Sequence, residues 1–376
     1  MPVMTFLTPC IFDHGAVMKL AKTLKGLGIA RPFIVTDEGV KSAGLLEQVT
    51  GVLDTEPAGI FAETDPNPTE RQAKEVLAAY LACDADGFIA LGGGSPMDMA
   101  KFVGLMATHD GPYEKYAAKS GGARFIGKIP PLVAIPTTAG TGSEVSVGAV
   151  VVLESGAKET FVSPNLIPVT AICDPDLTLT LPAHLTAATG IDAVTHCIEA
   201  VLTPMVNPPS EGVGYDGLHR AVGDGWLKRA VEDGADPEAR FHMMMASYEG
   251  ALAFVKGLGG VHALSHAAGR LHEKRLHHGR LNAVFLPAIL RAHGGSAEAK
   301  YERLGAAMGL GAGGDLPGAV EALCETLALP KTLSEMGVEA SDGPGIVDYA
   351  LTDLAHAGNP SEIDRAGYER IFEEVL

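Results

Sequence analysis

The sequence predicts an α/β nucleotide-binding domain with a parallel, Rossmann-like sheet, followed by an all-helical domain. Short β-rich runs alternate with helical patterns over residues 31–181, and strand-like runs nearly vanish after residue 182. The length of 376 residues also exceeds the size, about 250 to 300 residues, at which a single core stops growing. We therefore expect one domain at residues 1–181 and a second at residues 182–376.

The first domain contains apolar runs that we expect to form buried strands, because runs without alternation are typical of strands covered on both faces. They lie at residues 32–36, 59–63, 87–91, 132–136 and 169–173. After the second run, Thr69 is placed to cap a helix. The expected apolar face of this helix carries Ala73, Val76, Leu77, Tyr80 and Leu81.

The second domain is expected to begin after the Pro-bearing stretch at residues 174–182. Helical patterns cover residues 183–203, 237–255 and 258–271. Residues 204–217 and 309–318 are rich in Gly and Pro, which favours loops.

Charge and cysteine content exclude several classes of protein. With 28 basic and 46 acidic residues the formal charge is −18, which repels nucleic acid and anionic membranes. The five cysteines are scattered and never form a C-x-x-C pair, which argues against a disulfide framework and a thiolate zinc site. The N-terminal residues lack a basic start followed by an apolar run, and no segment approaches the length that spans a bilayer. We expect a cytoplasmic protein.

A glycine-rich turn, LGGGSPMDMAK at residues 91–101, joins a predicted strand to a predicted helix. We expect Ser95 to cap the helix, Pro96 to be its first residue, and Asp98 to complete a capping box. Gly93 and Gly94 would let backbone N–H groups approach a pyrophosphate. An ordinary tight turn fits equally well, because Met97 stands where the usual dinucleotide fingerprint has a third glycine.

Two further segments could contribute to a dinucleotide site. Asp37 follows the first long strand, where a carboxylate can bind an adenosine ribose and repel a 2′-phosphate. Taken alone, a carboxylate that starts a turn is the simpler interpretation. The stretch PTTAGTGSE at residues 136–144 follows another strand and offers hydroxyls and free N–H groups, although it could simply be a loop.

One carboxylate and several histidines indicate a metal site in the second domain. Asp192 and His196 are four residues apart on one helical face, and His262 and His266 repeat this spacing. A His277-His278-Gly279 turn follows. A lone histidine is usually structural, but this set suits a divalent transition metal, with zinc and iron indistinguishable by ligand type. Such a metal would act as a Lewis acid on a substrate hydroxyl during hydride transfer to nicotinamide.

Taken together, these motifs resemble the group III, iron-containing alcohol dehydrogenases in order and approximate spacing. The resemblance rests on GGGSPMDMAK, IPTTAGTGSEVS, GIDAVTHCIEA, VHALSHAAG and HHGRLNAVFLP, and it runs essentially end to end. It implies a dehydroquinate synthase-like fold, an NAD cofactor and a divalent metal, with Fe²⁺ favoured and Zn²⁺ as the alternative. It also implies a homodimer or larger homo-oligomer.

The resemblance implies roles for individual residues. The implied cofactor-binding residues are Asp37, Asn67, Gly93, Gly94, Ser95, Asp98, Thr137, Thr138, Thr141 and Lys158. The implied metal ligands are Asp192, His196, His262 and His278. His266 would support the ligands or relay a proton, and His266 and His278 are the catalytic candidates. The chain is about two residues longer than the common family pattern before Gly279, so His277 stays open as the fourth ligand.

The function that follows is NAD-linked oxidation of a small primary alcohol, diol or hydroxy acid, or reduction of the matching aldehyde. One alternative is a maleylacetate-reductase-like enzyme that uses the same cofactor without the full metal set. The other is a catalytically silent binding protein on the same fold.

Overall fold

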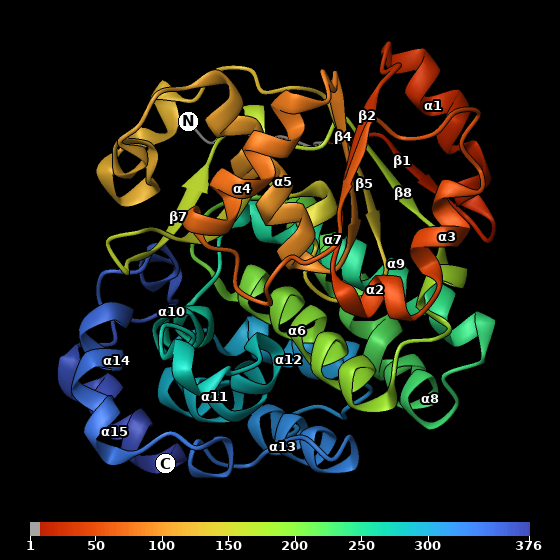
Figure 1. Ribbon diagram of the computed structural model, residues 1–376. Helices are drawn as coiled ribbons and strands as arrows, with labels where there is room; N and C mark the ends of the chain where they lie inside the picture. The colour runs from red at the N-terminus through yellow and green to blue at the C-terminus, as the bar shows by residue number, and fades with distance from the viewer. Residues whose placement is uncertain (1–7) are drawn as a thin grey trace. The chain divides into compact units, whose positions relative to one another are not determined.

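The structure is a computed structural model that describes residues 8–376. These residues form two compact units, both drawn in Figure 1. The α/β unit comprises residues 8–138 and 142–180, and the helical unit comprises residues 139–141 and 181–376.

A six-stranded parallel sheet forms the centre of the α/β unit, with the strand order β1-β8-β5-β4-β2-β3 (Figure 1). Its strands are β1 (Cys10–Phe12), β2 (Pro32–Val35), β3 (Gly59–Phe61), β4 (Gly87–Gly92), β5 (Leu132–Pro136) and β8 (Thr170–Cys173). All five predicted strands are confirmed, each end within two residues. The sequence did not reveal β1, which has only three residues, or the antiparallel pair β6 (Gly148–Val152) and β7 (Lys158–Val162).

Both faces of this sheet are covered, which explains the continuous apolar runs. Along β2, Phe33 and Val35 belong to one buried cluster, and Ile34 belongs to another on the opposite face. The helices of the unit are α1 (Leu20–Leu27), α2 (Glu38–Ser42), α3 (Leu45–Thr50), α4 (Glu70–Ala82) and α5 (Gly94–Thr108).

Helix α4 confirms its predicted start, because the Thr69 hydroxyl accepts a hydrogen bond from the Gln72 amide at 3.2 Å. Ala73, Val76 and Tyr80 are buried as expected. Leu81 is 59% exposed, contrary to expectation, because it lies at the edge of the apolar stripe in the last turn.

The helical unit contains ten α-helices among its described residues. They are α6 (Ala183–Leu202), α7 (Pro208–Leu218), α8 (Trp226–Glu232), α9 (Pro237–Ala253), α10 (Gly260–Ala268), α11 (His278–His293), α12 (Glu298–Ala307), α13 (Leu316–Thr326), α14 (Gly343–Ala350) and α15 (Arg365–Val375). Helix α7 occupies a segment expected to be a loop. Asn207 caps it by accepting from the Ser210 amide, and Pro208 fits its first turn, where no N–H partner is needed.

Helix α6 packs against α7, α9 and α11 and is held at both ends by buried cations. At its N-terminal end, the Arg240 guanidinium donates to the Leu181 carbonyl and to the Thr186 hydroxyl. At its C-terminal end, the Lys256 ammonium donates to the carbonyls of Ala200, Val201 and Thr203. A cation at this end also complements the helix dipole. Both ends of α6 are therefore held in place.

The expectation that no segment could span a bilayer is wrong as regards length and composition, because α6 has 20 residues and is apolar enough. However, 94% of its apolar window is buried inside the protein. Its apolar composition is that of a core helix.

Candidate metal centre and nucleotide-binding loops

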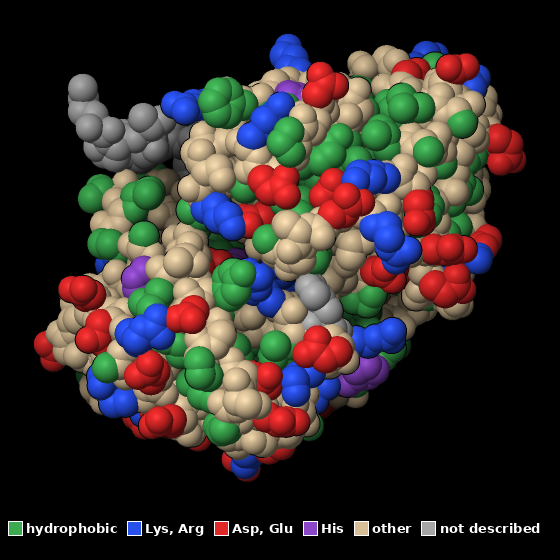
Figure 2. All heavy atoms as spheres, turned by 60° about the vertical axis from the view of Figure 1, so that its left-hand side comes forward, with side chains coloured by type: hydrophobic (Ala, Val, Ile, Leu, Met, Phe, Trp, Pro, Cys, Tyr) green, Lys and Arg blue, Asp and Glu red, His purple; other side chains and the backbone are tan. Residues whose placement is uncertain are grey.

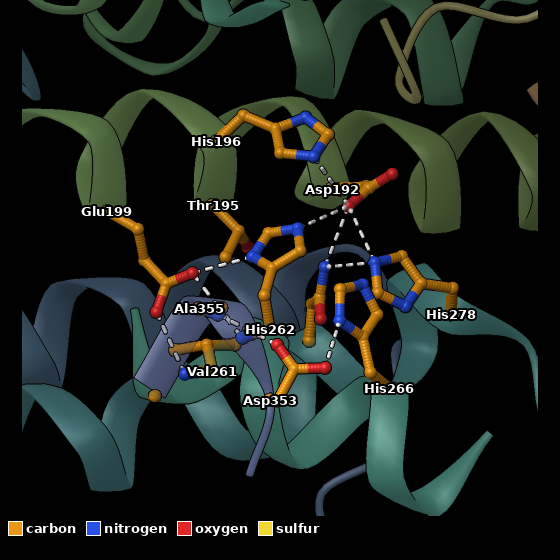
Figure 3. Close-up of polar contacts among 12 residues, drawn as sticks. Asp192, Thr195, His196, Glu199, Val261, His262, His266, His278, Asp353 and Ala355 are labelled. Atoms are coloured by element: carbon orange, nitrogen blue, oxygen red, sulfur yellow. Dashed lines mark hydrogen bonds and ion pairs between the residues drawn. The ribbon is translucent and has the colours of Figure 1, made fainter. Parts of the chain in front are cut away.

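Three imidazoles from three helices of the helical unit converge on one carboxylate oxygen (Figure 3). The Nε2 atoms of His196, His262 and His278 lie 3.6, 3.7 and 3.6 Å from Oδ1 of Asp192. Asp192, His196 and His262 are buried, and His278 is 34% exposed. The structure thus brings together all four of the predicted metal ligands.

A close approach of two helices places His278 beside Asp192. A Cβ on Gly279 would lie 1.8 Å from the Ala188 carbonyl oxygen, so only glycine lets the start of α11 lie against α6. His277 precedes α11, and its Nδ1 is buried without a hydrogen-bond partner among the described residues. Of the two adjacent histidines, His278 is the one with its ring nitrogen at Asp192.

Hydrogen bonds on the far side of two imidazoles fix which nitrogen carries the proton. His196 Nδ1 lies 3.1 Å from the Gly140 carbonyl, and His262 Nδ1 lies 2.6 Å from Oε2 of Glu199. A carbonyl oxygen and an ionised carboxylate only accept, so both Nδ1 atoms donate, and each ring in its neutral form turns an Nε2 lone pair toward Asp192. In the described part of the chain, His262 Nε2 is buried with no hydrogen-bond partner.

The electrostatics of this cluster call for a cation. Burial alone would raise the pKa of Asp192, but the surrounding imidazoles outweigh it and hold that pKa well below the usual range. Burial lowers the pKa of His196 to about 4. For His262, burial is outweighed by the carboxylates of Asp192 and Glu199, which raise its pKa to about 9, so a proton takes the place that a metal ion would fill. One carboxylate and three imidazoles with converging Nε2 atoms fit a divalent transition metal.

Two residues that support this cluster were missed in the sequence. Glu199 lies on α6, and its Oε1 also accepts from the Val261 amide at 2.8 Å. Burial would raise the pKa of Glu199, but these hydrogen bonds lower it. Asn282 on α11 donates to Oδ1 of Asp192 at 2.7 Å. Their helical spacing from Asp192 and His278 was the available signal, since Glu199 is seven residues after Asp192 and Asn282 is four after His278.

His266 lies beside the cluster without joining it. Its Nδ1 is 3.0 Å from Oδ2 of Asp353, and its ring stacks on that of His278 with 5.4 Å between centroids (Figure 3). Oδ1 of Asp353 accepts from the Ala355 amide, which fixes the carboxylate. The His266 side chain is 23% exposed, so this pair reaches solvent and is suited to orienting a substrate or passing a proton.

The glycine turn of the α/β unit differs from its expected geometry. Helix α5 begins at Gly94, and Gly93 precedes it without any side-chain cap, so the predicted capping box of Ser95 and Asp98 is wrong. The Ser95 hydroxyl donates to the Pro66 carbonyl at 2.6 Å instead. Because Gly94 takes helical angles, the helix starts before Ser95, and its first N–H groups have no side-chain acceptor.

The glycine turn is closely packed, so there is no room for a side chain at Gly92. Gly92 has φ = +144°, and a Cβ there would lie 2.8 Å from Pro96 Cγ. The Thr137 amide donates to the Gly92 carbonyl at 3.0 Å, and the Thr138 hydroxyl would lie 3.4 Å from a Cβ on Gly93. That hydroxyl is buried with no hydrogen-bond partner in residues 8–376. An uncapped helix start with such a hydroxyl beside it fits a pyrophosphate.

The other predicted cofactor residues are distributed as follows. Asp37 caps α2 by accepting from the Val40 amide at 2.9 Å, and burial raises its pKa. Its Oδ2 would lie 3.2 Å from a Cβ on Gly92, so it does border the glycine turn. Lys158 donates to Oδ1 of Asn67 at 3.0 Å. Thr141 groups with the helical unit, whereas Thr137 and Thr138 belong to the α/β unit.

Comparison with known proteins places the whole chain in one family. Residues 8–175 match the model of iron-containing alcohol dehydrogenases, and residues 186–376 match the C-terminal model of the same family. A 4-hydroxybutyrate dehydrogenase from Cupriavidus necator is 45% identical, with 99% of each chain covered. Among solved structures, a 1,3-propanediol oxidoreductase has a TM-score of 0.93, and an alcohol dehydrogenase from Oenococcus oeni has one of 0.92. Each is 30% identical and covers 100% of both chains. The chain therefore belongs to the iron-containing alcohol dehydrogenase family, and it is an oxidoreductase of the alcohol dehydrogenase type.

Proposed function

We propose that the protein is an NAD-linked, metal-dependent dehydrogenase that oxidises a short hydroxy acid, or reduces the matching semialdehyde. The observation that carries the proposal is the convergence of three Nε2 atoms on Asp192, with the buried Nε2 of His262 lacking a hydrogen-bond partner among the described residues. The 45% identity with a 4-hydroxybutyrate dehydrogenase supports the substrate class.

In this proposal Asp192, His196, His262 and His278 hold a divalent ion, Fe²⁺ by the family's name and Zn²⁺ as the other candidate. When bound, the ion would supply Lewis acidity that lowers the pKa of a substrate hydroxyl, and NAD would supply the hydride acceptor. Glu199 holds His262 in the tautomer whose Nε2 is unprotonated, and Asn282 holds the Asp192 carboxylate. His266, oriented by Asp353, takes up or returns the proton at the edge of the site.

For the substrate's carboxylate we propose Arg270, which lies two residues beyond the end of α10, the helix that carries His262 and His266. Its guanidinium lies over the ring of Tyr349, and Tyr349 is four residues before Asp353, the partner of His266. Lys274 is less suitable, because it donates to the Gly337 carbonyl and lies 3.4 Å from Asp342. A charge-assisted hydrogen bond to a carboxylate is worth roughly 1.5 to 3 kcal/mol, about ten- to a hundredfold in affinity.

The test compares kcat/KM for 4-hydroxybutyrate and 1-butanol with NAD as acceptor. We expect wild type to prefer the acid, and Arg270→Ala to lose at least tenfold of that preference while its rate with 1-butanol changes little. Arg275→Ala is the control, because Arg275 is an exposed cation in the same segment. Equal specificity for both substrates in wild type would refute the substrate class, and an unchanged preference in Arg270→Ala would refute only the assignment of Arg270.

Two other functions give different results in the same assays. A maleylacetate-reductase-like enzyme would work without metal, which the complete set of four ligand side chains argues against. A silent binding protein would bind no nicotinamide, so titration with NADH followed by its absorbance or fluorescence separates it from both enzymes.

We infer a cytoplasmic homodimer or larger homo-oligomer, as the family resemblance suggests, with no nucleic-acid or membrane partner. The net charge of −18 supports the absence of a polyanionic partner. On the face shown in Figure 2, acidic and basic side chains are interspersed and do not form one basic patch. Light scattering after size exclusion, at low and moderate salt, tests the assembly.

A further inference from the structure

A fully buried lysine lies inside the α/β unit, on the helix that follows the three glycines of the glycine turn. Lys101, on α5, has 0% exposure. Its ammonium donates to the carbonyls of Ser143, Ser146 and Gly148 at 2.7, 3.1 and 2.8 Å, and it lies 2.9 Å from the Ser143 hydroxyl. All four acceptors belong to one short stretch of chain, residues 143–148.

Asp98, one turn earlier on α5, binds the same stretch from its other side. Its Oδ1 accepts from the Ser143 hydroxyl at 2.8 Å, and its Oδ2 accepts from the Val150 amide at 3.0 Å. Both carboxylate oxygens are therefore already engaged by the protein. Asp98 was predicted to bind the cofactor directly, but its contacts are those of an anchor for residues 143–150.

The stretch that these two residues hold continues directly from the candidate nucleotide-binding threonines. Thr137 is tied to the glycine turn through its amide, which donates to the Gly92 carbonyl. Residues 138–142 then leave the sheet, and the chain is tied down again at Ser143 by Lys101 and Asp98. Both ends of this five-residue loop are thus fixed to the ends of β4 and α5, the elements that form the glycine turn.

Stability alone does not account for such a charge pair. Taking an ammonium and a carboxylate out of water is costly, and well-packed apolar residues often replace buried charges without loss of stability. What the two residues provide is one fixed conformation for the polar stretch at residues 143–150.

We propose that Lys101 and Asp98 are positioning residues for the dinucleotide, which anchor residues 143–150 and so help to keep Thr138 beside the glycine turn, where it can receive the cofactor's phosphates. The inference rests on the proposed use of NAD. It assigns Asp98 to shaping the site rather than touching the ligand. It also predicts that the pair acts chiefly on nucleotide affinity, because it anchors residues 143–150, whereas the Gly140 carbonyl that accepts from His196 groups with the helical unit.

The test measures NADH binding to the full-length metal-loaded enzyme by nicotinamide fluorescence, together with metal content and separate KM values for NAD and alcohol. Lys101→Met should raise the Kd for NADH at least tenfold and raise KM for NAD, with KM for alcohol and metal content within twofold of wild type. Ser143→Ala removes only the hydroxyl that links Lys101 to Asp98, so it should raise the Kd three- to tenfold and keep the fold. Lys74→Met is the matched control, because Lys74 is a half-exposed lysine of the same unit that pairs with Glu70 and Glu154.

The inference is overturned if Ser143→Ala and any folded Lys101→Met protein bind NADH within twofold of wild type. It is also overturned if both KM values rise together with loss of metal, since that pattern indicates general destabilisation. If Lys101→Met does not fold, Ser143→Ala decides alone. Wild-type enzyme that binds no NADH would instead refute the proposed function.

Discussion

Replacing Glu199 by Gln exchanges one carboxylate oxygen for an NH₂ group while keeping the size of the side chain. The change lies on the side of His262 that faces away from Asp192. In the wild-type protein, Oε2 accepts from His262 Nδ1 at 2.6 Å and Oε1 accepts from the Val261 amide at 2.8 Å. A glutamine has one oxygen and one NH₂ group, so it can accept at only one of these two positions.

Either orientation of the glutamine is unfavourable. With its NH₂ toward His262, Nδ1 must become the acceptor, and the proton moves to Nε2, the atom that faces Asp192. With its NH₂ toward Val261, a buried amide at the start of α10 loses its acceptor, at a cost of about 1 to 3 kcal/mol. Replacing residues that orient a metal-binding histidine typically costs ten- to a hundredfold in metal affinity, or about 1.4 to 2.7 kcal/mol.

The assay is competition for Zn²⁺ against a chromophoric chelator, on metal-free protein, with Fe²⁺ repeated under anaerobic conditions. We expect Glu199→Gln to bind metal ten- to a hundredfold more weakly than wild type. Glu232→Gln is the control, because Glu232 is an exposed carboxylate on α8 that pairs with Lys228. Metal affinity within twofold of wild type, in a folded Glu199→Gln protein, would refute the tautomer argument.

The remaining predictions concern cofactor choice and pH. Asp37→Gly should raise the kcat/KM ratio of NADP to NAD by at least tenfold, since it removes a carboxylate beside the glycine turn, while costing only a few tenths of a kcal/mol as a lost helix cap; an unchanged ratio would make Asp37 a cap alone. Burial, and then the hydrogen bond with Asp216, raise the pKa of Glu249 from 4.5 to about 8 despite the nearby Arg220. The folded state therefore binds more protons than the unfolded state between these values, and wild type should lose up to a few kcal/mol of stability as pH rises from 4.5 through 8. Denaturant unfolding at pH 5.5 and 8.5 checks this: Glu249→Gln should show a smaller pH dependence than wild type, and equal slopes would contradict the argument.

The sheet was predictable because its strands are buried on both faces. That burial forces an uninterrupted apolar run such as LVAIP at β5, whose bounds the structure reproduces. Strand β1 was not predicted because three residues are too few to show a period. The β6–β7 pair was not predicted because it directly follows the polar segment at residues 136–144. Helix α7 was missed although Asn207 and Pro208 form a good start signal, because three prolines and three glycines in residues 204–217 suggested a loop.

The metal cluster was predictable for a related reason, because i, i+4 spacing puts Asp192 with His196, and His262 with His266, on one face of a helix. The choice of His278 over His277 needed the approach of α11 to α6 at Gly279, a long-range packing fact that spacing cannot supply. The roles of Asp98 and Lys101 were hidden in the same way, since their partners lie 42 to 52 residues further along the chain. The local sequence suggested a capping box, whereas Asp98 accepts hydrogen bonds from the distant Ser143 and Val150.

We propose that Asp192, His196, His262 and His278 hold a metal ion on which turnover depends. The most direct measurement is elemental analysis combined with turnover, on wild type and His262→Ala purified without air. The account predicts a divalent metal in active wild type, and loss of both metal and activity in His262→Ala, because this change removes the buried Nε2 that faces Asp192. Wild type that turns over without metal, or a His262→Ala protein that lacks metal yet keeps wild-type turnover, would contradict it.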